Sequence, residues 1–467
     1  MGEHNCTKSL LIITIIICSS SILSLTFGKA VNGDTIASSP TKMSENKKQV
    51  ILTAMLTDLS EPKRWQFLFQ PSLEELRKRH PDLDIQINYS STYPYGETRA
   101  ALLNALGNKS AIDLISVDQI WLGELANRGF LADLTNRAAS WGRLSDWYQA
   151  NLDGSLYNDK IYGIWAWTDV LGIWYWKDML SKSGVNPSSL MTWDGYLAAA
   201  KKINNTLSTG QGEEGKENNT IIQAMHINGD INSPDRWYPY LWMLGGAIVE
   251  MRPGHPTKDF YWFPAYNSSD GAKALEFLKE QIDIGLKAQS CGCGNQDSPF
   301  VERKFAVMLS GSWMPSYFQD KVKFEQSVGF LPVFPVPDKS IQSATMMGGW
   351  ALSIPSTSQH KDLAWELITI ILDPKILAPW LQRYGYLPTQ ASIGEGPFSS
   401  QLQQSIPYYK EMVSMIDLGW SRPSIPEYSQ IAQHIKQALD EVYSGLKEPK
   451  QALDDAAAKS AKVLGWQ

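Results

Sequence analysis

The sequence lacks the residues and motifs on which most enzyme classes depend. It has 6 histidines in 467 residues, and it contains no G-x-S-x-G, no G-x-x-x-x-G-K, no H-E-x-x-H and no C-x-x-C motif. These absences leave little support for a serine hydrolase, a nucleotide phosphate loop, a zinc protease or a redox dithiol. We expect a protein that is not an enzyme and that has no catalytic residue, no metal and no cofactor, while an enzyme that uses paired carboxylates stays open.

Cysteine is scarce. Of the 4 cysteines, Cys6 and Cys18 lie in the N-terminal region, and Cys291 and Cys293 flank Gly292. No histidine or further cysteine pair accompanies the second two, which disfavours a zinc site. A strained local disulfide and two thiols in a tight loop both remain open.

Clusters of basic residues are also missing. The chain has 42 lysines and arginines against 48 acidic residues, a formal net charge of -6, and no Lys/Arg block. Such a charge pattern argues against a nucleic-acid partner.

The N-terminal region carries targeting features. Residues 1–27 contain an apolar run and are expected to be a signal peptide or a membrane anchor. Lipidation at Cys18 is a third alternative, although the bulky Ile17 before it departs from the usual pattern. Residues 28–48 are rich in Ser, Thr, Lys, Asn and Gly and are expected to be a flexible tether. Together these features predict an exported protein held at the outer face of the cytoplasmic membrane.

Aromatic residues are abundant, with 18 tryptophans, and they gather between residues 157 and 180. The pattern predicts a strand over 161–165, a break at Thr168-Asp169 and a second apolar run over 170–176. A buried core segment is one interpretation. The other is a site for a polyhydroxylated ring, which stacks on Trp165 or Trp167 and donates hydroxyl hydrogens to Asp169.

The N-terminal part of the mature chain alternates strands with helices. Strands are expected at 49–55, 84–89 and 111–117, with helices at 63–80 and 97–106, which is typical of a parallel sheet in an α/β fold. Asp118 follows the third strand, at the edge where such sheets bind ligands, and Trp121 is close by. Asp118 would serve equally as the N-cap of the next helix, and the two roles are compatible.

Further aromatic and glycine-rich stretches follow. Residues 232–242 concentrate aromatics, and a short strand at 306–309 leads through a turn to Trp313. Gly349 and Trp350 precede a strand expected at 351–354. Amphipathic helices are expected at 270–284, 361–372, 428–444 and 449–464.

Several stretches in order resemble one known family. These are DLISVDQIWLGELANRGFLADLT (113–135), YNDKIYGIWAWTDVLGIWYWKDML (157–180), ERKFAVMLSGSW (302–313), GGWALSIPSTSQHKDLAWELITIILDP (348–374), GYLPT (385–389) and RPSIPEY (422–428). The chain resembles the extracellular solute-binding proteins of ABC importers, in the group that binds sugars such as maltose and trehalose.

The resemblance implies a two-lobe α/β fold of the periplasmic-binding-protein type. Each lobe would hold a mainly parallel sheet flanked by helices, and the ligand would bind in the cleft between the lobes. Lobe 1 would comprise residues 49–163 and 339–392, and lobe 2 residues 164–338 and 393–467. It also implies a monomer that hands its sugar to membrane permease subunits with a cytoplasmic ATPase. The ligand-binding residues expected are Asp118, Trp121, Trp165, Trp167, Asp169, Trp237, Tyr238, Trp242, Trp313, Gly349, Trp350 and Arg422.

Three alternatives stay open from sequence. A secreted glycoside-active enzyme would use Asp118 and Asp169 as its paired carboxylates. A binder of another solute, such as a polyamine, glycerol phosphate or an oligopeptide, would need different groups in the cleft, and a phosphate would need more cations than Arg422 provides. A surface structural protein would show no ligand-dependent stabilisation.

Overall fold

A computed structural model describes residues 34–36, 47–57, 62–92, 95–207, 223–228, 233–284, 288–289, 297–318, 320–332 and 334–466. The predicted signal or anchor, Cys18 and the Cys291–Cys293 loop lie outside these residues. Within the predicted tether, residues 34–36 form a strand that pairs with residues 87–89. The predicted tether thus contains a short strand, and its role as a flexible tether stays a prediction.

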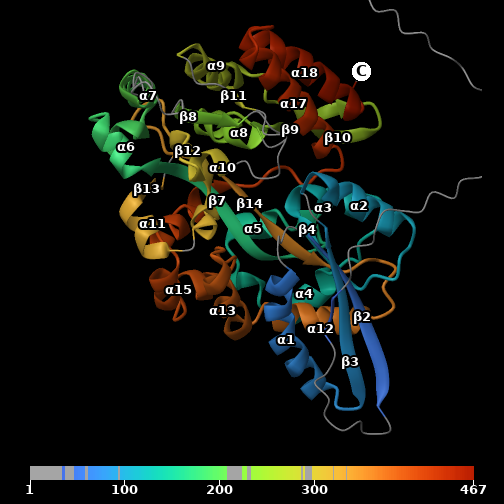
Figure 1. Ribbon diagram of the computed structural model, residues 1–467. Helices are drawn as coiled ribbons and strands as arrows, with labels where there is room; N and C mark the ends of the chain where they lie inside the picture. The colour runs from blue at the N-terminus through green and yellow to red at the C-terminus, as the bar shows by residue number, and fades with distance from the viewer. Residues whose placement is uncertain are drawn as a thin grey trace, which may run out of the picture.

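One curved sheet runs through the molecule (Figure 1). Its strand order is β1 (Asp34–Ile36), β3 (Leu83–Thr92), β2 (Lys48–Thr57), β4 (Leu114–Asp118), β14 (Thr345–Ser353), β7 (Ile164–Trp176), β12 (Phe305–Gly311), β8 (Gln223–Asn228) and β11 (Ala288–Gln289), with β13 (Val328–Leu331) beside β7 and β15 (Gly419–Trp420) beside β14. Two small sheets pair β9 (Val249–His255) with β10 (Lys258–Pro264), and β5 (Leu156–Tyr157) with β6 (Lys160–Ile161).

The predicted parallel unit is confirmed. β2 pairs in parallel with both β3 and β4. The helix α1 (Pro62–Arg79) joins β2 to β3, and α2 (Tyr95–Gly107) joins β3 to β4. This β-α-β-α-β unit brings Asp118 to the carboxyl end of β4, where α3 (Gln119–Asn127) begins.

The central strand β7 corrects the prediction of a break at Thr168-Asp169. These two residues continue the antiparallel ladder, opposite Gly349 and Gly348 of β14. The Thr168 hydroxyl donates to the Gly348 carbonyl at 2.7 Å, so its polar side chain is satisfied inside the sheet. Because β7 also pairs with β12 and β13, one unbroken strand belongs to both halves of the sheet.

β14 also starts earlier than predicted, at Thr345, so its glycines lie within the strand. Gly349 has φ +152°, and a Cβ on it would lie 2.5 Å from the Trp167 carbonyl oxygen. Glycine is thus required at this position by close backbone approach and by its own conformation, not by a turn.

The remaining helices fall into two groups on either side of β7 and β14 (Figure 1). In the upper group α17 packs on α18 and α8, and α9 packs on α18; in the lower group α1 packs on α12 and α13. The helices are α4 (Thr135–Trp141), α5 (Gln149–Asp153), α6 (Lys177–Lys182), α7 (Trp193–Leu207), α8 (Ser233–Met243), α9 (Ser269–Asp283), α10 (Ser298–Val301), α11 (Lys321–Ser327), α12 (Lys361–Ile371), α13 (Pro374–Tyr384), α14 (Ala391–Gly394), α15 (Ser399–Ser405), α16 (Tyr409–Val413), α17 (Tyr428–Tyr443) and α18 (Pro449–Val463), with 3-10 turns η1 (Leu144–Asp146), η2 (Pro187–Met191), η3 (Met314–Tyr317) and η4 (Ile416–Leu418). No helix within the described ranges has the length and apolar character needed to cross a membrane.

Most of the tryptophans fill the core. Trp174 and Trp176, expected to be mainly core, are 0% and 5% exposed, which confirms that expectation. Trp174 packs on Phe330 with ring centres 4.4 Å apart, and Trp176 stacks on Phe300. All 18 tryptophans lie within the described ranges, and Trp420, at 54%, is the one exposed indole among them.

Candidate functional site

Polar and aromatic side chains converge along β14. Trp350 lies opposite Asp118 of β4 and opposite Trp167 of β7, while Gly348 lies opposite Asp169. Residues directly opposite one another in an antiparallel pair project from the same face of the sheet. The sheet therefore brings Asp118, Asp169 and Trp350 to one face, although they are up to 232 positions apart in sequence.

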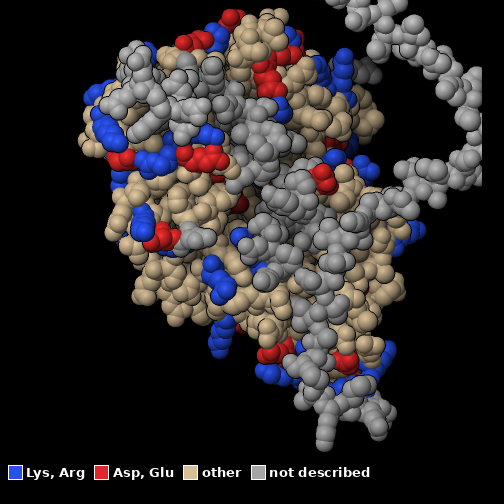
Figure 2. Space-filling view, in the orientation of Figure 1, with Lys and Arg blue, Asp and Glu red and all other residues tan. Residues whose placement is uncertain are grey.

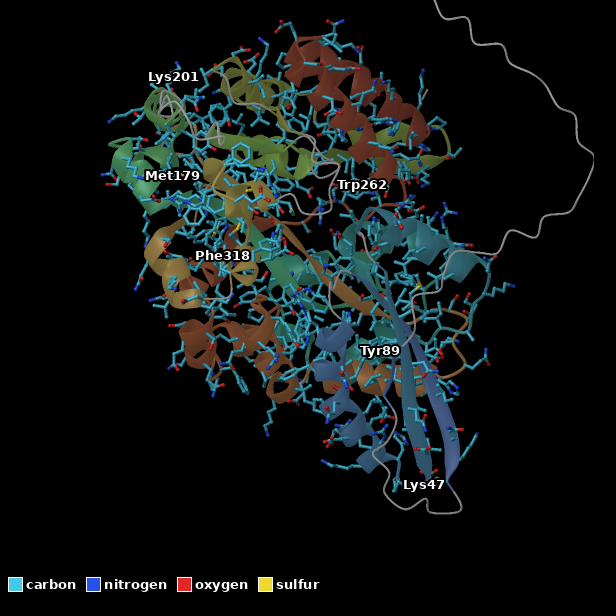
Figure 3. The ribbon with its side chains drawn as sticks, in the orientation of Figure 1. Lys47, Tyr89, Met179, Lys201, Trp262 and Phe318 are labelled. Atoms are coloured by element: carbon cyan, nitrogen blue, oxygen red, sulfur yellow. The ribbon has the colours of Figure 1, made fainter. Side chains whose placement is uncertain are left out.

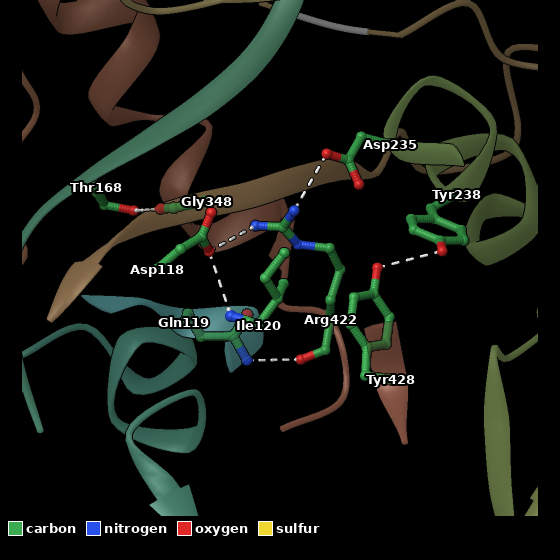
Figure 4. A network of polar contacts seen from close by, with 9 residues as sticks. All are labelled: Asp118, Gln119, Ile120, Thr168, Asp235, Tyr238, Gly348, Arg422 and Tyr428. Carbon is green, nitrogen blue, oxygen red and sulfur yellow. Dashed lines mark hydrogen bonds and ion pairs between the residues drawn. The ribbon is translucent and has the colours of Figure 1, made fainter. Parts of the chain in front are cut away.

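Arg422 joins this group through a buried ion bridge (Figure 4). Its guanidinium lies 3.1 Å from an Asp235 carboxylate oxygen and 3.5 Å from Asp118 Oδ1, with 5% of the Arg422 side chain exposed. The shorter contact is a charge-assisted hydrogen bond, so Asp235 holds the arginine more closely than Asp118 does. Gln119 fixes the backbone by donating to the Arg422 carbonyl at 2.7 Å.

Asp118 has the N-cap role as well. Its Oδ1 accepts a hydrogen bond from the Ile120 amide at 3.2 Å, at the first turn of α3. That prediction is confirmed, and a ligand-binding role for the same carboxylate stays a prediction.

Asp169 lies in a different electrostatic environment. Its carboxylate rests over Gly348, where an added Cβ would meet Oδ1 at 2.6 Å. Burial raises the pKa of Asp169 to about 7; the nearby Arg422 opposes this, and the charges of Asp118 and Asp235 add to it. Near neutral pH the carboxyl is thus present in both protonation states, and it can donate a hydrogen bond as well as accept one.

The predicted aromatic residues divide into two sets. Trp121 and Trp350 form an edge-to-face pair at 6.0 Å beside Asp118. Tyr238 accepts a hydrogen bond from the Tyr428 hydroxyl at 3.2 Å, and it packs against Trp242. Trp121, Trp350 and Trp242 are 5%, 4% and 7% exposed, and their role in ligand contact stays a prediction. Tyr238 is 0% exposed, so it is enclosed by protein in this arrangement.

Others are enclosed by protein. Trp167 is 1% exposed and packs against Trp380 and Tyr386 at 4.9 and 5.7 Å, and Trp165 is 0% exposed. A ring could not stack on either indole without opening that core, because the described structure leaves neither with an exposed face. Trp237 is likewise fully buried.

Trp313 is half-buried and oriented by Asp297, which accepts its indole hydrogen at 2.6 Å. It lies between β12 and η3, as the N-cap residue of η3. Its role as an aromatic platform stays a prediction.

Sequence reasoning missed three residues of this region. Asp235 stands in the first turn of α8, within the stretch noted for its aromatics alone. Tyr428, read as a helix start, contributes the hydroxyl that meets Tyr238. Trp420 stacks on Trp242 with ring centres 5.9 Å apart and planes at 18°. The high aromatic content was a signal for Trp420, but nothing local marked Asp235 as a partner of Arg422.

Among the residues that the structure describes, no group of three or more His, Cys, Asp and Glu side chains is arranged to hold a metal ion. The expectation of no metal and no cofactor stays a prediction for the whole chain.

Solved structures show which fold the chain has. The GacH receptor of Streptomyces glaucescens, solved unliganded and with acarbose, superposes with a TM-score of 0.70 at 22% identity, covering 90% of this chain and all of that one. An ABC transporter solute-binding protein of Thermotoga lettingae, bound with α-D-tagatose, gives 0.71 at 21% identity with the same coverage. The chain thus has the fold of the transporter solute-binding proteins, as its two groups of helices about a shared sheet indicate.

Sequence comparison identifies the family. Residues 73–405 match the family of bacterial extracellular solute-binding proteins, and the chain belongs to that family. The arabinooligosaccharide-binding protein of Bacillus subtilis is 24% identical over 308 residues, 63% of this chain and 64% of that protein. A putative binding protein of Brucella abortus is 22% identical over 414 residues, 84% of this chain and 90% of that protein. The resemblance to extracellular solute-binding proteins is therefore confirmed.

Proposed function

We propose that this protein is the extracytoplasmic substrate-binding component of an ABC importer and captures a sugar, from a monosaccharide to an oligosaccharide of the maltose or trehalose type. The convergence of Asp118, Asp169 and Arg422 beside Trp350 supports this most strongly. Carboxylates and a guanidinium recognise hydroxyl groups, and indole rings stack on the C–H faces of a pyranose. Relatives and structural neighbours named for arabinooligosaccharide, acarbose and maltotriose binding point the same way.

The binding step we propose involves no chemistry. Lobe 1 (residues 49–163 and 339–392) would carry Asp118, and lobe 2 (residues 164–338 and 393–467) would carry Asp169, Asp235 and Arg422. A sugar that contacts both lobes favours the closed arrangement and shifts the population towards it. The ion bridge between Arg422 and Asp118 would then join the two lobes. Hydroxyl groups of the sugar would form hydrogen bonds with these two charged side chains.

The partners follow from the same proposal. The closed, loaded form would be recognised by permease subunits in the membrane, whose transport a cytoplasmic ATPase drives. We propose that the protein acts as a monomer, is exported and is held near the outer face of the cytoplasmic membrane.

The first test is a thermal-shift screen of the purified protein against glucose, maltose, trehalose, maltotriose, arabinose and arabinooligosaccharides. A binder present at a hundred times its dissociation constant adds about 2.7 kcal/mol to the stability of the folded state. The expected result is a rise in melting temperature with at least one sugar and no product on chromatography of the mixture. Hydrolysis that Asp169→Asn abolishes would instead establish the glycoside-active enzyme, and a panel without any shift would contradict sugar capture.

Trp420 is expected to contribute a stacking surface for the sugar. One face of this indole rests on Trp242, and the side chain is 54% exposed. Replacing Trp420 by alanine should weaken binding of the sugar found in the screen about fivefold, since aromatic stacking contributes roughly 1 kcal/mol. Isothermal calorimetry measures the change, and Trp420→Phe should recover part of it.

Phe260→Ala provides the matched control for Trp420→Ala, because Phe260 is exposed to a similar extent, at 58%, on the separate β9–β10 hairpin. Equal losses in the two variants would rule out a specific role for Trp420. Trp350→Ala is a poorer probe, because Trp350 is 4% exposed and removing a buried tryptophan costs about 3–5 kcal/mol of stability.

A further inference from the structure

A recess lies between α1, α13, α15 and the η3–α11 segment, and Arg422 and its ion-bridge partners are not part of its wall. Its volume is about 90 Å³, and none of the residues predicted for sugar binding lines it. Its wall consists of Arg64, Pro315, Ser316, Lys321, Gln382, Arg383, Tyr384, Gly385, Ser405, Ile406 and Pro407. Sites for drug-sized ligands measure about 300–1,000 Å³, so this recess is suited to a small group rather than to a whole drug-sized molecule.

The charge of this wall is one-sided. Arg64, Lys321 and Arg383 line the recess, and no aspartate or glutamate does. The chain as a whole has a formal net charge of -6. A recess lined by three cations and no acidic residue therefore has the opposite sign of charge from the whole chain. Figure 2 shows basic side chains on this part of the molecular face, where α1 and α13 lie in Figure 1.

Within the described part of the chain, none of the three cations forms an ion pair. Arg64 donates through Nη1 to the Tyr386 hydroxyl at 3.0 Å, while its Nε is buried without an acceptor. Lys321 donates to the Pro315 carbonyl, a neutral partner. Arg383 lies over the rings of Phe67 and Tyr384, at 5.2 and 5.8 Å from their centres. Each cation is thus held in place by neutral groups, and its charge is left uncompensated.

Neutral donors stand beside the cations. Gln382 Nε2 donates to Ser405 Oγ at 2.8 Å, so the hydroxyl hydrogen of Ser405 is available to another acceptor. Ser316 adds a second hydroxyl to the wall. Arginine, lysine and hydroxyl donors around one small volume are the groups that bind carboxylate and phosphate oxygens.

We propose that this recess binds an oxyanion, a carboxylate or a phosphate group. The anion is either part of the captured solute, as in a sugar acid or sugar phosphate, or a separate small anion. Arg64 and Arg383 belong to the proposed lobe 1, and Lys321 and Ser405 to the proposed lobe 2, so a bound anion would bridge the two. The inference rests on the recess itself and does not require that the ligand of the Arg422 region be a sugar.

The test compares the wild-type protein with Lys321→Gln/Arg383→Gln, which removes two charges and keeps both side chains polar. Lys201→Gln/Lys462→Gln is the matched control, because it removes equal charge from exposed positions on α7 and α18; Figure 3 shows Lys201 at the end of the molecule opposite α1. Sodium phosphate is titrated by calorimetry at constant ionic strength. Binding to the wild type and to the control is expected, with at least about tenfold weaker binding to Lys321→Gln/Arg383→Gln. No phosphate binding to the wild type, or equal binding to both double variants, would overturn the proposal.

Glucose and glucuronate then separate the two sources of the anion. If the group belongs to the solute, glucuronate binds the wild type more tightly than glucose does, and Lys321→Gln/Arg383→Gln removes the difference. If the anion is separate, phosphate changes the affinity for glucose and glucuronate has no advantage. If phosphate binds but neither glucose nor glucuronate does, the oxyanion site is supported and only the proposal of sugar capture is contradicted.

Discussion

Replacing Asp169 by asparagine is expected to raise the stability of the ligand-free protein at pH 8 by up to about 4 kcal/mol and to change it little at pH 4. Burial raises the pKa of this carboxyl from 3.8 to about 7, a difference worth at most about 4 kcal/mol at 1.4 kcal/mol per pKa unit. Between pH 3.8 and about pH 7 the folded state binds more protons than the unfolded state. The contribution of the neutral carboxyl is therefore complete below pH 3.8 and is lost as the pH rises through 7. Asparagine is neutral at every pH and avoids that loss.

Melting temperatures of the wild type and Asp169→Asn across pH 4–9 measure this effect. Asp362→Asn is a suitable control, because it makes the same substitution at a carboxyl whose side chain is 87% exposed. A lower stability of Asp169→Asn at pH 8 would contradict the assignment. The same variant should bind its sugar at least tenfold more weakly, since a charge-assisted hydrogen bond to hydroxyl contributes about 1.5–3 kcal/mol. Gain of stability with loss of affinity would mark Asp169 as a residue kept for binding.

Replacing Arg422 by methionine should be among the most destabilising single changes in the protein. Arg422 lies between Asp118 and Asp235, and all three side chains are at most 11% exposed. Removing one partner of a buried ion bridge leaves its counter-charges uncompensated and costs about 3–5 kcal/mol. Urea denaturation of the wild type and Arg422→Met measures the difference in the free energy of unfolding.

Two comparisons make the Arg422 result specific. Arg137→Met breaks the surface pair with Asp362 and should cost no more than about 1 kcal/mol. Adding Asp118→Asn and Asp235→Asn to Arg422→Met should restore much of the lost stability, since the stranded charges are then gone. If Arg422→Met lowered the free energy of unfolding no more than Arg137→Met does, the buried bridge would not stabilise the protein by the amount that its burial implies.

Local patterns predicted a large part of the fold. The helices α1, α12, α17 and α18 begin and end within two residues of the predicted bounds, because each has one apolar face and clear terminal residues. The parallel β2–β3–β4 unit followed from the alternation of strands and helices. In these segments propensity, periodicity and tertiary packing all favour the same structure.

Errors arose where long-range pairing decided the outcome. Thr168-Asp169 looked like a break, yet ladder partners on β14 keep the strand continuous. The bridge from Arg422 to Asp235 joins residues 187 positions apart, and no local signal relates them. Composition did not distinguish a tryptophan that fills the core, such as Trp167, from one at the surface, such as Trp420. Only the packing around each ring separates the two.

The stack of Trp420 on Trp242 also gives the protein an intrinsic spectroscopic probe. An indole in contact with water emits at longer wavelength than a buried one, and Trp420 is the exposed indole among 18. Two nearly parallel indoles 5.9 Å apart also couple their electronic transitions. The red edge of the emission, its quenching by acrylamide and a near-ultraviolet circular dichroism band would therefore report mainly on this site, two residues from Arg422, because the other tryptophans are buried or only partly exposed.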